Sequence, residues 1–478
     1  MNLIKKIAFN TLVHSAGKFG ASLIGVFIVA ILTRYLGVDG YGEYTTIFAY
    51  LFFFAILTDL GLYVVTVNEL GRSEFGEERF FNNIFSIRFF SALIFLTLAS
   101  VLVFVFPYSG LIKLGVMVAS VSIFLNLIDQ IVVAFFQNKM NMKRVAVAEL
   151  VGKLVTLGLT ILVVYLGLGL LWVMVTIIVG FSFNLAINLV YLRRYIKLRF
   201  SFELNIWKKI LKKSWPIAVT SVFSLIYFKA DTLALSILPV NEMYAASREQ
   251  AVGIYGAPYK ILEVLIAWPA IFMGLVSPLL AKAVAEKKKI EFNVIFQKAF
   301  DILSIIIWPM IIGVLVLAKP LMVLIAGHAF AASGIPFQIL IFAVGIIFLT
   351  HLTTYAIIAL GKQKKMIKYY ALAAVLALIG YLILIPKYSY LGAAGMTLGV
   401  ELFMLIATLY LLKREILIKI NLVVFGRAML SAVVMGFMLT FLLNFNIILL
   451  IIAGAIVYLG LIWIFNGINK EMLSEFKK

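Results

Sequence analysis

Long apolar stretches separated by short polar segments recur along the whole chain. Each is about 20 residues or longer, the length with which a helix crosses a hydrocarbon core of roughly 30 Å. The pattern predicts an all-α polytopic membrane protein with about 14 transmembrane helices. The expected spans are 7–33, 41–67, 83–106, 111–137, 145–167, 169–192, 215–239, 250–281, 298–318, 335–360, 367–385, 391–412, 423–443 and 447–466.

Composition agrees with this pattern. Of the 478 residues, 64% are hydrophobic and 13% are charged, and the mean hydropathy is +1.12, which is outside the range of soluble globular proteins. The first apolar stretch is too long for a signal peptide and no small-residue cleavage site follows it, so we expect it to remain as a helix. The absence of cysteine excludes disulfides and thiolate metal sites.

A net charge of +20 is high enough to suggest nucleic-acid binding, so the positions of the charges along the chain must be considered. Most Lys and Arg residues fall in loops that share one side of the membrane in the fourteen-helix arrangement. Those expected on the other side are Arg34, Lys113, Arg248, Lys319 and Lys387. This asymmetry predicts a multi-pass protein of the cell membrane with both termini in the cytoplasm, and no nucleic-acid partner.

The longest polar break, Tyr191 to Pro216, divides the chain. In its second half Ile206 and Ile210 share one helical face and lysines occupy the other, which predicts an amphipathic helix on the anionic lipids of the inner leaflet. A solvated linker that anchors the topology is the alternative. We expect an N-terminal lobe at 1–192, a basic amphipathic cytoplasmic linker at 193–214, a C-terminal lobe at 215–412, and two further helices with a cytoplasmic tail at 413–478.

The two six-helix lobes are expected to be pseudo-symmetric. A Gly-x-Tyr motif begins the second helix of each lobe, at Gly42/Tyr44 and at Gly253/Tyr255. Internal repeats of this kind are common in transporters that hold substrate between two rocking lobes.

Lysines lie deep in three predicted helices. A charge near the bilayer centre costs at least about 2.5 to 3.5 kcal/mol, so such residues normally face water or a partner. Lys18 shares a polar stripe with His14, while Lys229 and Lys260 lie well inside the seventh and eighth helices. We expect Lys18, Lys229, Lys260 and His14 to bind an anionic substrate in a positively lined cleft, with buried structural ion pairs as the alternative.

Acids in the same helices are candidates for coupling or gating. Asp59, Asp129 and Glu401 could answer the lysines or carry H+ or Na+. Asp231 is expected to meet a neighbouring helix or a helix end as a structural or gating partner, and Glu263 is spaced to touch Lys260. Lys229 and Asp231 are about 200° apart around a helix, so we expect them to have different partners.

Other charged residues are expected to be structural. Glu149 and Lys153 are spaced to form an ion pair. Arg88 and Asp301, near helix ends, are expected to reach water by snorkelling, and His351 to hydrogen-bond within the bundle.

Signatures of catalysis are missing from the sequence. No phosphate-binding loop, metal-binding histidine spacing or cluster of catalytic acids is present, and only three histidines occur. We therefore expect no enzyme activity, no catalytic residue, no metal and no cofactor.

Three segments together resemble a known family. "LTRYLGVDGYGEYTTIFAYLFFFAILTDLGL" (32–62), "YFKADTLALSILPV" and "AVGIYGAPYKILEVL" are similar to the polysaccharide-transporter branch, the Wzx-type oligosaccharide flippases, of the multidrug, oligosaccharidyl-lipid and polysaccharide exporter superfamily. "YLGAAGMTLGVELFMLI" (390–406) resembles the twelfth helix of that family. The resemblance covers almost the whole chain, through the order and spacing of loose motifs.

The resemblance implies a flippase that moves a polyprenyl-linked oligosaccharide across the cytoplasmic membrane by alternating access, through a cationic central cavity. It maps the basic-x-Asp pattern to Lys229 and Asp231, the Gly-x-Tyr motif to Gly253 and Tyr255 with Lys260 following, and the acid of the second helix to Asp59. Lysine stands where related flippases often have arginine, which argues against bidentate phosphate recognition. Glycan-assembly enzymes are the further partners that the family implies.

Two other functions stay open at this point. A cation-coupled multidrug exporter of the same superfamily would favour a cavity rich in acids, and the deep lysines argue against it. A membrane glycan polymerase or glycosyltransferase would need clustered catalytic acids or a large outer loop, and the sequence offers neither.

Overall fold

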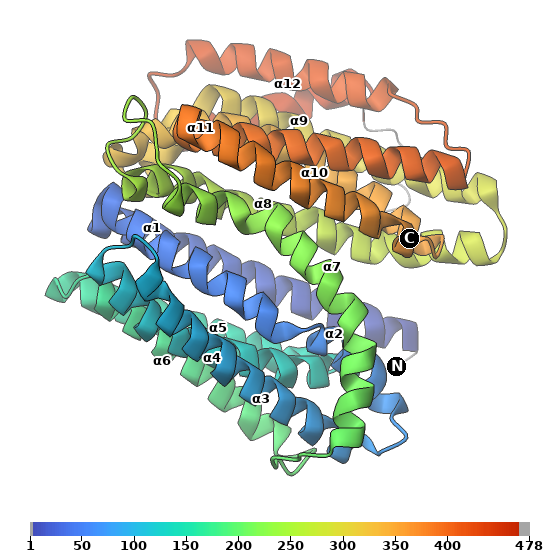
Figure 1. Cartoon of the computed structure of the whole chain (residues 1–478). Helices are drawn as coiled ribbons and strands as arrows, with labels where there is room; N and C mark the ends of the chain where they lie inside the picture. Colours follow the sequence, from blue (N-terminus) through green and yellow to red (C-terminus); the bar gives the residue numbers. More distant parts are fainter. Residues whose placement is uncertain (1–2, 468–478) are drawn as a thin grey trace. The chain divides into compact units, whose positions relative to one another are not determined.

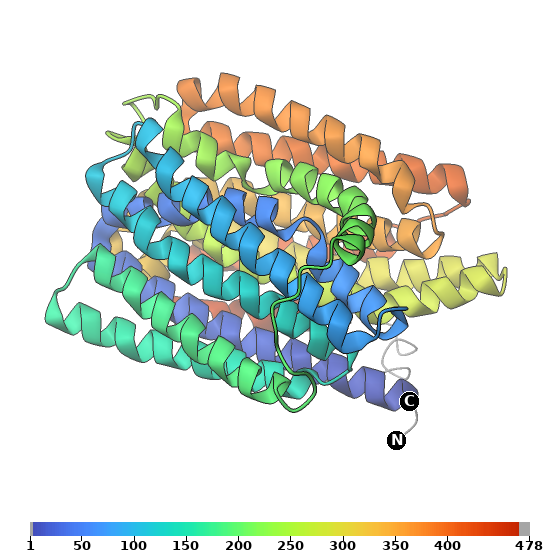
Figure 2. The same cartoon turned by 60° about the horizontal axis from the view of Figure 1, so that its bottom comes forward.

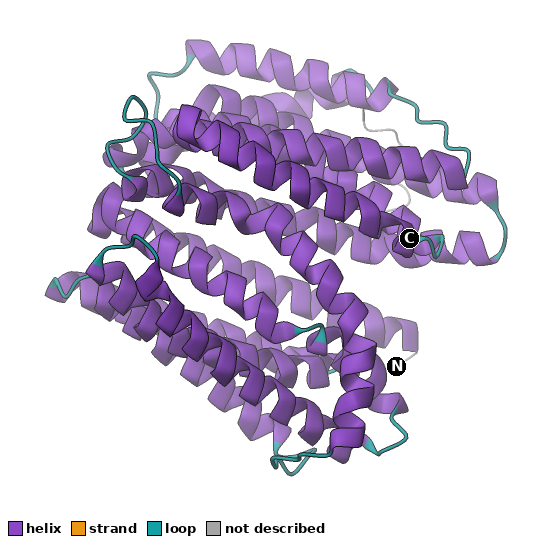
Figure 3. Cartoon of the chain, in the orientation of Figure 1, coloured by secondary structure: helices purple, strands orange, loops and turns teal. Residues whose placement is uncertain are grey.

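The computed structural model describes residues 3–467, without the side chains of residues 3–16, 220, 221, 224, 225, 227 and 228. Every regular element in this range is helical (Figure 3). The predicted all-α class is therefore confirmed. The chain forms two compact units, Met1–Gly253 and Ile254–Lys478.

The helices of the first unit are α1 (Leu3–Asp59), α2 (Leu62–Glu69), α3 (Glu77–Leu102), α4 (Gly110–Asn138), α5 (Met142–Leu166), α6 (Leu170–Leu192) and α7 (Leu204–Ile237). The next helix, α8 (Arg248–Ala285), begins in the first unit and continues in the second. The second unit continues with α9 (Lys289–Ala326), α10 (Gly334–Ala359), α11 (Ile367–Glu415), α12 (Val423–Phe441) and α13 (Ile447–Ile464) (Figure 1).

Two of these helices each contain two membrane crossings. At 1.5 Å per residue the 57 residues of α1 would extend about 85 Å as a straight rod, far beyond a bilayer. The chain instead reverses at Gly37, whose φ of 69° and ψ of −173° are not helical (Figure 1). In α11 the break is at Ser389, with φ of 50°, and Tyr381 and Thr397 hydroxyls meet at 3.4 Å across the hairpin.

The number of crossings agrees with the prediction. Eleven helices of the described chain are long and apolar enough to span a membrane. Because α1 and α11 each cross twice and α7 supplies one more segment, the structure provides fourteen crossings.

The predicted second span, 41–67, is interrupted. Leu60 and Gly61 adopt φ of 48° and 75°, and α2 starts after them. A side chain at position 61 would lie 2.9 Å from the carbonyl oxygen of Ser214 in α7, so the backbone of α7 leaves room for glycine alone. Periodicity cannot show this break because its cause lies about 150 residues away.

The linker between α6 and α7 is tied to α3 along its length (Figure 2). Asn82 donates to the carbonyl oxygen of Lys197 and accepts from the amide of Arg199. Further along, the amide of Ser201 donates to Ser86 Oγ at 2.8 Å. Alternate linker residues thus face α3, as in an extended strand, and polar side chains of α3 supply the hydrogen bonds.

The expected amphipathic helix is the first part of α7, and its apolar face is covered by protein. Ile206 and Ile210 are 2% and 1% exposed. Lys209 pairs with Glu74, and Lys213 with Glu69, each at 2.5 Å. The acids around α2 therefore bind half of the lysine face that the sequence suggested for anionic lipid.

The first Gly-x-Tyr motif meets the beginning of the second. A side chain at Gly42 would collide with the backbone carbonyl of Glu249, and one at Gly253 with the backbone carbonyl of Val38. Because 38 and 249, like 42 and 253, are 211 positions apart, the contact is reciprocal, as at a twofold axis. Ser247 Oγ donates to Asp39 Oδ1 at 3.0 Å beside it.

We predict that Gly42→Ala destabilises the protein, because the new methyl group must displace the backbone at Glu249, at a cost of about 1 to 3 kcal/mol. A lower melting temperature in detergent measures this. Gly25→Ala is the matched control, since nothing lies within 4 Å of that position. Equal melting temperatures for the two variants would contradict the close backbone contact between Gly42 and Glu249.

A second prediction concerns the linker. Hydrogen bonds from Arg79 lower the pKa of Glu203 from 4.5 to about 2. A lowered pKa gives the contact its full stabilisation above pH 4.5, and this stabilisation declines below that pH and is gone once the pH has fallen through about 2. We expect amide-exchange protection factors in residues 197–203 to be equal at pH 7 and pH 6, and to fall at both values in Arg79→Ala. Lys139→Ala, which breaks an exposed pair with Glu77, is the control.

Candidate functional site

A fully buried arginine links three helices of the first unit. Arg88 of α3 is 0% exposed, and its Nη1 lies 2.8 Å from Asp59 Oδ1 at the end of α1. Its Nη2 donates to Gln130 Oε1 at 2.8 Å, and its Nε to the carbonyl oxygen of Leu127, both on α4. The expectation that Arg88 reaches water by snorkelling is therefore wrong.

The side chain of Asp59 is not fully buried. Its second oxygen accepts from the amide of Gly61 at 3.2 Å, and 22% of its side chain is exposed. Because a guanidinium already neutralises it, Asp59 is better placed to hold helices together than to bind a cation.

Lys18 and Lys229, the two deep lysines of the first unit, are accessible. Lys18 is exposed and lies beside Gly17, where α1 approaches Ala146 of α5 too closely for a side chain. Its electrostatic neighbour is Glu149, which also interacts with Lys153 as the spacing predicted. Lys229 of α7 is half-buried, and its ammonium lies 5.6 Å from the centre of the Phe52 ring.

Asp231 has a different environment from Lys229. It is 1% exposed, and its Oδ1 accepts from the amide of Thr232 at 2.6 Å and from its hydroxyl at 3.2 Å. Local hydrogen bonds of this kind stabilise a buried carboxylate in its helix.

In the second unit a lysine and an acid form a direct pair. Lys260 Nζ lies 2.6 Å from Glu263 Oε2, one turn further along α8, and both side chains are partly exposed. The structure shows the pair that sequence spacing allowed. Lys260 therefore meets a substrate only in competition with Glu263.

The remaining candidates are scattered. Glu401 is 1% exposed in the second half of α11, where it acts electrostatically on Tyr370. His351 Nδ1 lies 2.9 Å from the carbonyl oxygen of Ile347, as expected for a hydrogen bond within the bundle. The side chain of His14 lies outside the described residues.

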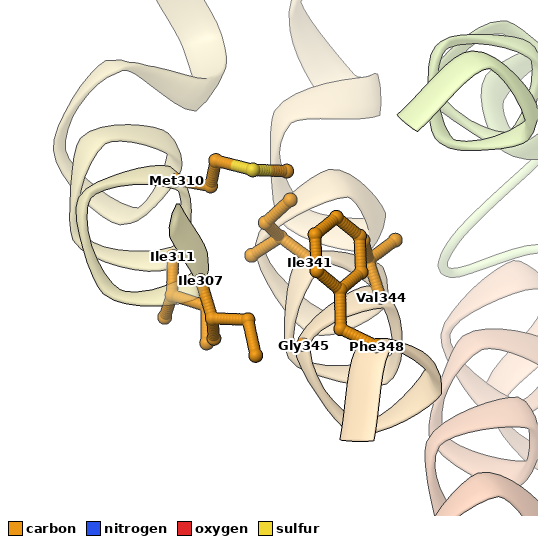
Figure 4. Close-up of a pocket in the computed structure, with 7 residues that line it drawn as sticks. All are labelled: Ile307, Met310, Ile311, Ile341, Val344, Gly345 and Phe348. Atoms are coloured by element: carbon orange, nitrogen blue, oxygen red, sulfur yellow. The ribbon is translucent and has the colours of Figure 1, made fainter. Parts of the chain in front are cut away.

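An apolar niche lies between α9 and α10 (Figure 4). It is too narrow to hold a water molecule, and it is lined by Ile307, Met310, Ile311, Ile341, Val344, Gly345 and Phe348. No polar side chain reaches it, so it offers nothing to a charged head group. The described residues also contain no group of three or more His, Cys, Asp or Glu side chains that could hold a metal ion.

Comparison with known protein families shows to which family a chain with these helices and buried charges belongs. The family model for polysaccharide biosynthesis proteins matches residues 7–284, more than half of the chain. The chain belongs to this family. No curated protein sequence matches it.

Solved structures show that this polysaccharide biosynthesis protein has a transporter fold. The lipid II flippase MurJ in an inward closed conformation matches with a TM-score of 0.77 and 16% identity, over 95% of this chain and 98% of MurJ. A multidrug resistance MATE family transporter of the MOP superfamily matches with a TM-score of 0.66 and 15% identity, over 83% and 93%. A MOP superfamily transporter from Pyrococcus furiosus matches at 0.60 and 14%, over 86% and 94%.

Two polar interactions that hold the helices of this family member together were not predicted from the sequence. Arg88 lies only eleven residues after the first residue of α3, and hydropathy alone places such a residue near water. The polar residues Asn82, Asn83 and Ser86, spaced by one and three positions in an otherwise apolar segment, were the available signal for the linker contact.

We predict that Arg88→Ala destabilises the protein by about 3 to 5 kcal/mol, because it leaves Asp59 and Gln130 without their shared partner. Arg79→Ala removes an exposed pair and should cost about 1 kcal/mol or less. Thermal unfolding of the two purified variants compares them directly. If Arg88→Ala is no less stable than Arg79→Ala, the buried cluster does not hold the first unit together.

Proposed function

We propose that the protein is a flippase that moves a lipid-linked oligosaccharide across the cell membrane by alternating access. The observation that carries this proposal is the family match over residues 7–284, combined with accessible lysines inside spanning helices. The likeness of fold to the lipid II flippase supports it. The proposal assigns no chemical step to the protein, so the chain acts as a transporter and not as an enzyme.

The lysines fit an anionic head group. Lys18 lies 15 residues after the first residue of α1, about 23 Å along the helix, and Lys260 lies 12 residues after Arg248, about 18 Å along α8. Exposed ammonium groups at such depth are favourable only next to water or an anion. Lys18 and Lys229 of the first unit, and Lys260 of the second, would each offer a point charge to a pyrophosphate or acidic sugar, while the lipid tail stays in the bilayer.

The acids take supporting roles in this proposal. Glu263 releases Lys260 to the substrate, and Asp231 keeps the segment around Lys229 rigid. Asp59 with Arg88 fixes the end of the first hairpin, and Glu401 remains a candidate for a coupling H+. The cytoplasm would face the two termini, since an even number of crossings returns the chain to the side on which it began and the basic loops lie on that side.

The test is a flipping assay in proteoliposomes that contain a polyprenyl-pyrophosphate oligosaccharide, with protection of the sugar from a membrane-impermeant oxidant as the readout. Lys18→Ala and Lys229→Ala should each slow flipping about 10- to 100-fold, because a hydrogen bond to a charged group contributes about 1.5 to 3 kcal/mol. Lys260→Ala should have a smaller effect, since Glu263 already neutralises this lysine.

Two controls make the result specific. Lys18→Arg and Lys229→Arg keep the charge and should retain most of the rate. Lys364→Ala, at an exposed site between α10 and α11, should flip as the unaltered protein does. Normal flipping by the double variant Lys18→Ala/Lys229→Ala would refute a cationic binding surface.

Export of an organic cation is the second candidate function, because the fold also matches multidrug transporters. It makes the opposite prediction for the same variants. Removing the lysines should leave export of a fluorescent cation unchanged or faster, and flipping of the oligosaccharide should be undetectable in the unaltered protein.

A further inference from the structure

The turns between α4 and α5 and between α10 and α11 have the same backbone geometry. Met140 and Gly361 both adopt left-handed conformations, with φ of 52° and 70°. The amide of the next residue, Asn141 in the first unit and Lys362 in the second, donates to the carbonyl oxygen five positions earlier, at 2.9 and 3.1 Å. Corresponding positions are 221 residues apart in the sequence, so the two turns are equivalent parts of the internal repeat.

The segments that follow α6 and α11 are equivalent as well. The carbonyl oxygen of Lys197 accepts from Asn82 of α3, and the carbonyl oxygen of Leu417 accepts from Asn293 of α9, both at 3.1 Å. The two asparagines are 211 positions apart in the sequence, and the two carbonyl groups are 220 positions apart. Each segment therefore lies in the same register on the third helix of its lobe.

Tyr195 and Glu415, two residues before these carbonyl groups, are equivalent acceptors, but only one of them carries a charge. The carboxylate of Glu415 pairs with Lys365. In the first unit Arg144, 221 positions before Lys365, donates from Nη1 to the hydroxyl of Tyr195 at 3.2 Å. The residue after the left-handed turn makes a second contact to each acceptor, at 3.5 Å to Glu415 and 3.2 Å to Tyr195. The cation is kept in both units, whereas a neutral hydroxyl replaces the carboxylate in the first.

A second observation concerns two arginines beside the ring of Tyr191. The guanidinium carbon of Arg144 lies 4.9 Å from the centre of this ring, and that of Arg194 lies 5.8 Å from it. In the part of the chain whose side chains are described, neither arginine forms an ion pair with an acid, and four acids of nearby loops and helix ends pair with other cations. These acids are Glu69, Glu74, Glu77 and Glu203. Two like charges beside one ring repel each other, so this place attracts an anion.

We propose that this basic corner, made of Arg144, Tyr191, Arg194 and Tyr195, binds the phosphate group of an anionic phospholipid. The phosphate lies beside Arg144 as the carboxylate of Glu415 lies beside its lysine. A guanidinium has five N–H donors, and the described residues accept one hydrogen bond from that of Arg144. Its planar fork matches two phosphate oxygens. Arg144 also lies in the first turn of α5, where the helix dipole favours a negative charge.

The apolar surface beside the basic corner favours a lipid over free phosphate. Val147 and Leu154 follow Arg144 on the same face of α5, three and ten positions later, and both are exposed. On α6, Val190 lies four positions before Arg194 and is exposed too. The acyl chains of a lipid whose head group binds at the basic corner contact these side chains, whereas a phosphate ion does not reach them.

The test is binding of phosphatidylglycerol to the purified full chain in detergent, measured by native mass spectrometry. Phosphatidylcholine with the same acyl chains is the probe without net charge. We expect phosphatidylglycerol to bind at least about 10-fold more tightly. Arg144→Gln should weaken its binding about 10- to 100-fold, because hydrogen bonds to a charged group are lost. Arg144→Lys should recover only part of the affinity, since an ammonium lacks the planar pair of donors.

Tyr195→Glu distinguishes this site from a general effect of charge. It gives Arg144 the carboxylate that the equivalent lysine has, so it should weaken phosphatidylglycerol binding as much as Arg144→Gln does, with both arginines still present. Lys208→Ala is the matched control, because it also removes one positive charge from the first unit. Lys208 is exposed on α7 and forms no ion pair with any described acid. This variant should bind phosphatidylglycerol as the unaltered protein does.

Circular dichroism and gel filtration establish that each variant is folded, and if Tyr195→Glu does not fold, Arg144→Gln and Arg144→Lys decide the question. The proposal is overturned if the two lipids bind equally, or if Arg144→Gln weakens binding no more than Lys208→Ala. Displacement of the lipid by an equal concentration of inorganic phosphate would indicate a site for the free ion, and tighter binding of a glutamate-rich peptide would indicate a protein partner. Either result overturns the proposal. None of these measurements uses a lipid-linked oligosaccharide or transport, so their outcome is independent of the proposed flippase function.

Discussion

A charge cannot remain alone inside a bundle of apolar helices, and the pairing of Arg88 with Asp59 shows how the first unit satisfies this constraint. The guanidinium bonds a carboxylate of α1, an amide of α4 and a backbone carbonyl of α4, so one side chain determines the positions of three helices. Taking two charges out of water is costly, and the gain in attraction does not always exceed that cost. The arrangement is better understood as specifying one packing of α1, α3 and α4 than as adding stability.

How much the sequence could predict depends on the range of the interaction. The helical class and the fourteen crossings were predictable because each rests on hydropathy within about 20 residues. The pair Lys260–Glu263 was foreseen by spacing, since its atoms lie on one turn of one helix. The break at Gly61 and the burial of Arg88 were not predictable, because α7 and α4 cause them from distant parts of the chain. Charged residues near a helix end look alike in sequence whether water or a partner receives them.

The glycine crossing connects the repeat to mechanism. The sequence identified Gly42 and Gly253 as equivalent positions. In the structure each glycine contacts the backbone four residues before the other glycine. A reciprocal contact of backbones has no long side chains that must rearrange when it separates. Under the proposed alternating access, such a surface would suit helix ends that meet and part repeatedly, whereas a contact made of interlocked side chains would be slower to open.

The pair Lys260–Glu263 sets a condition on how an anion could be carried. Since the ammonium already has a counter-ion 2.6 Å away, an arriving phosphate gains only the difference between its own attraction and that of the carboxylate. Binding is then weaker than to a lone lysine, and release on the far side is correspondingly easier. A transporter needs this balance, because a site that held the head group too tightly would bind it without releasing it. The displaced carboxylate also becomes a charged group that lacks its partner, so under the proposed function the binding of an anion at Lys260 favours uptake of a cation at Glu263.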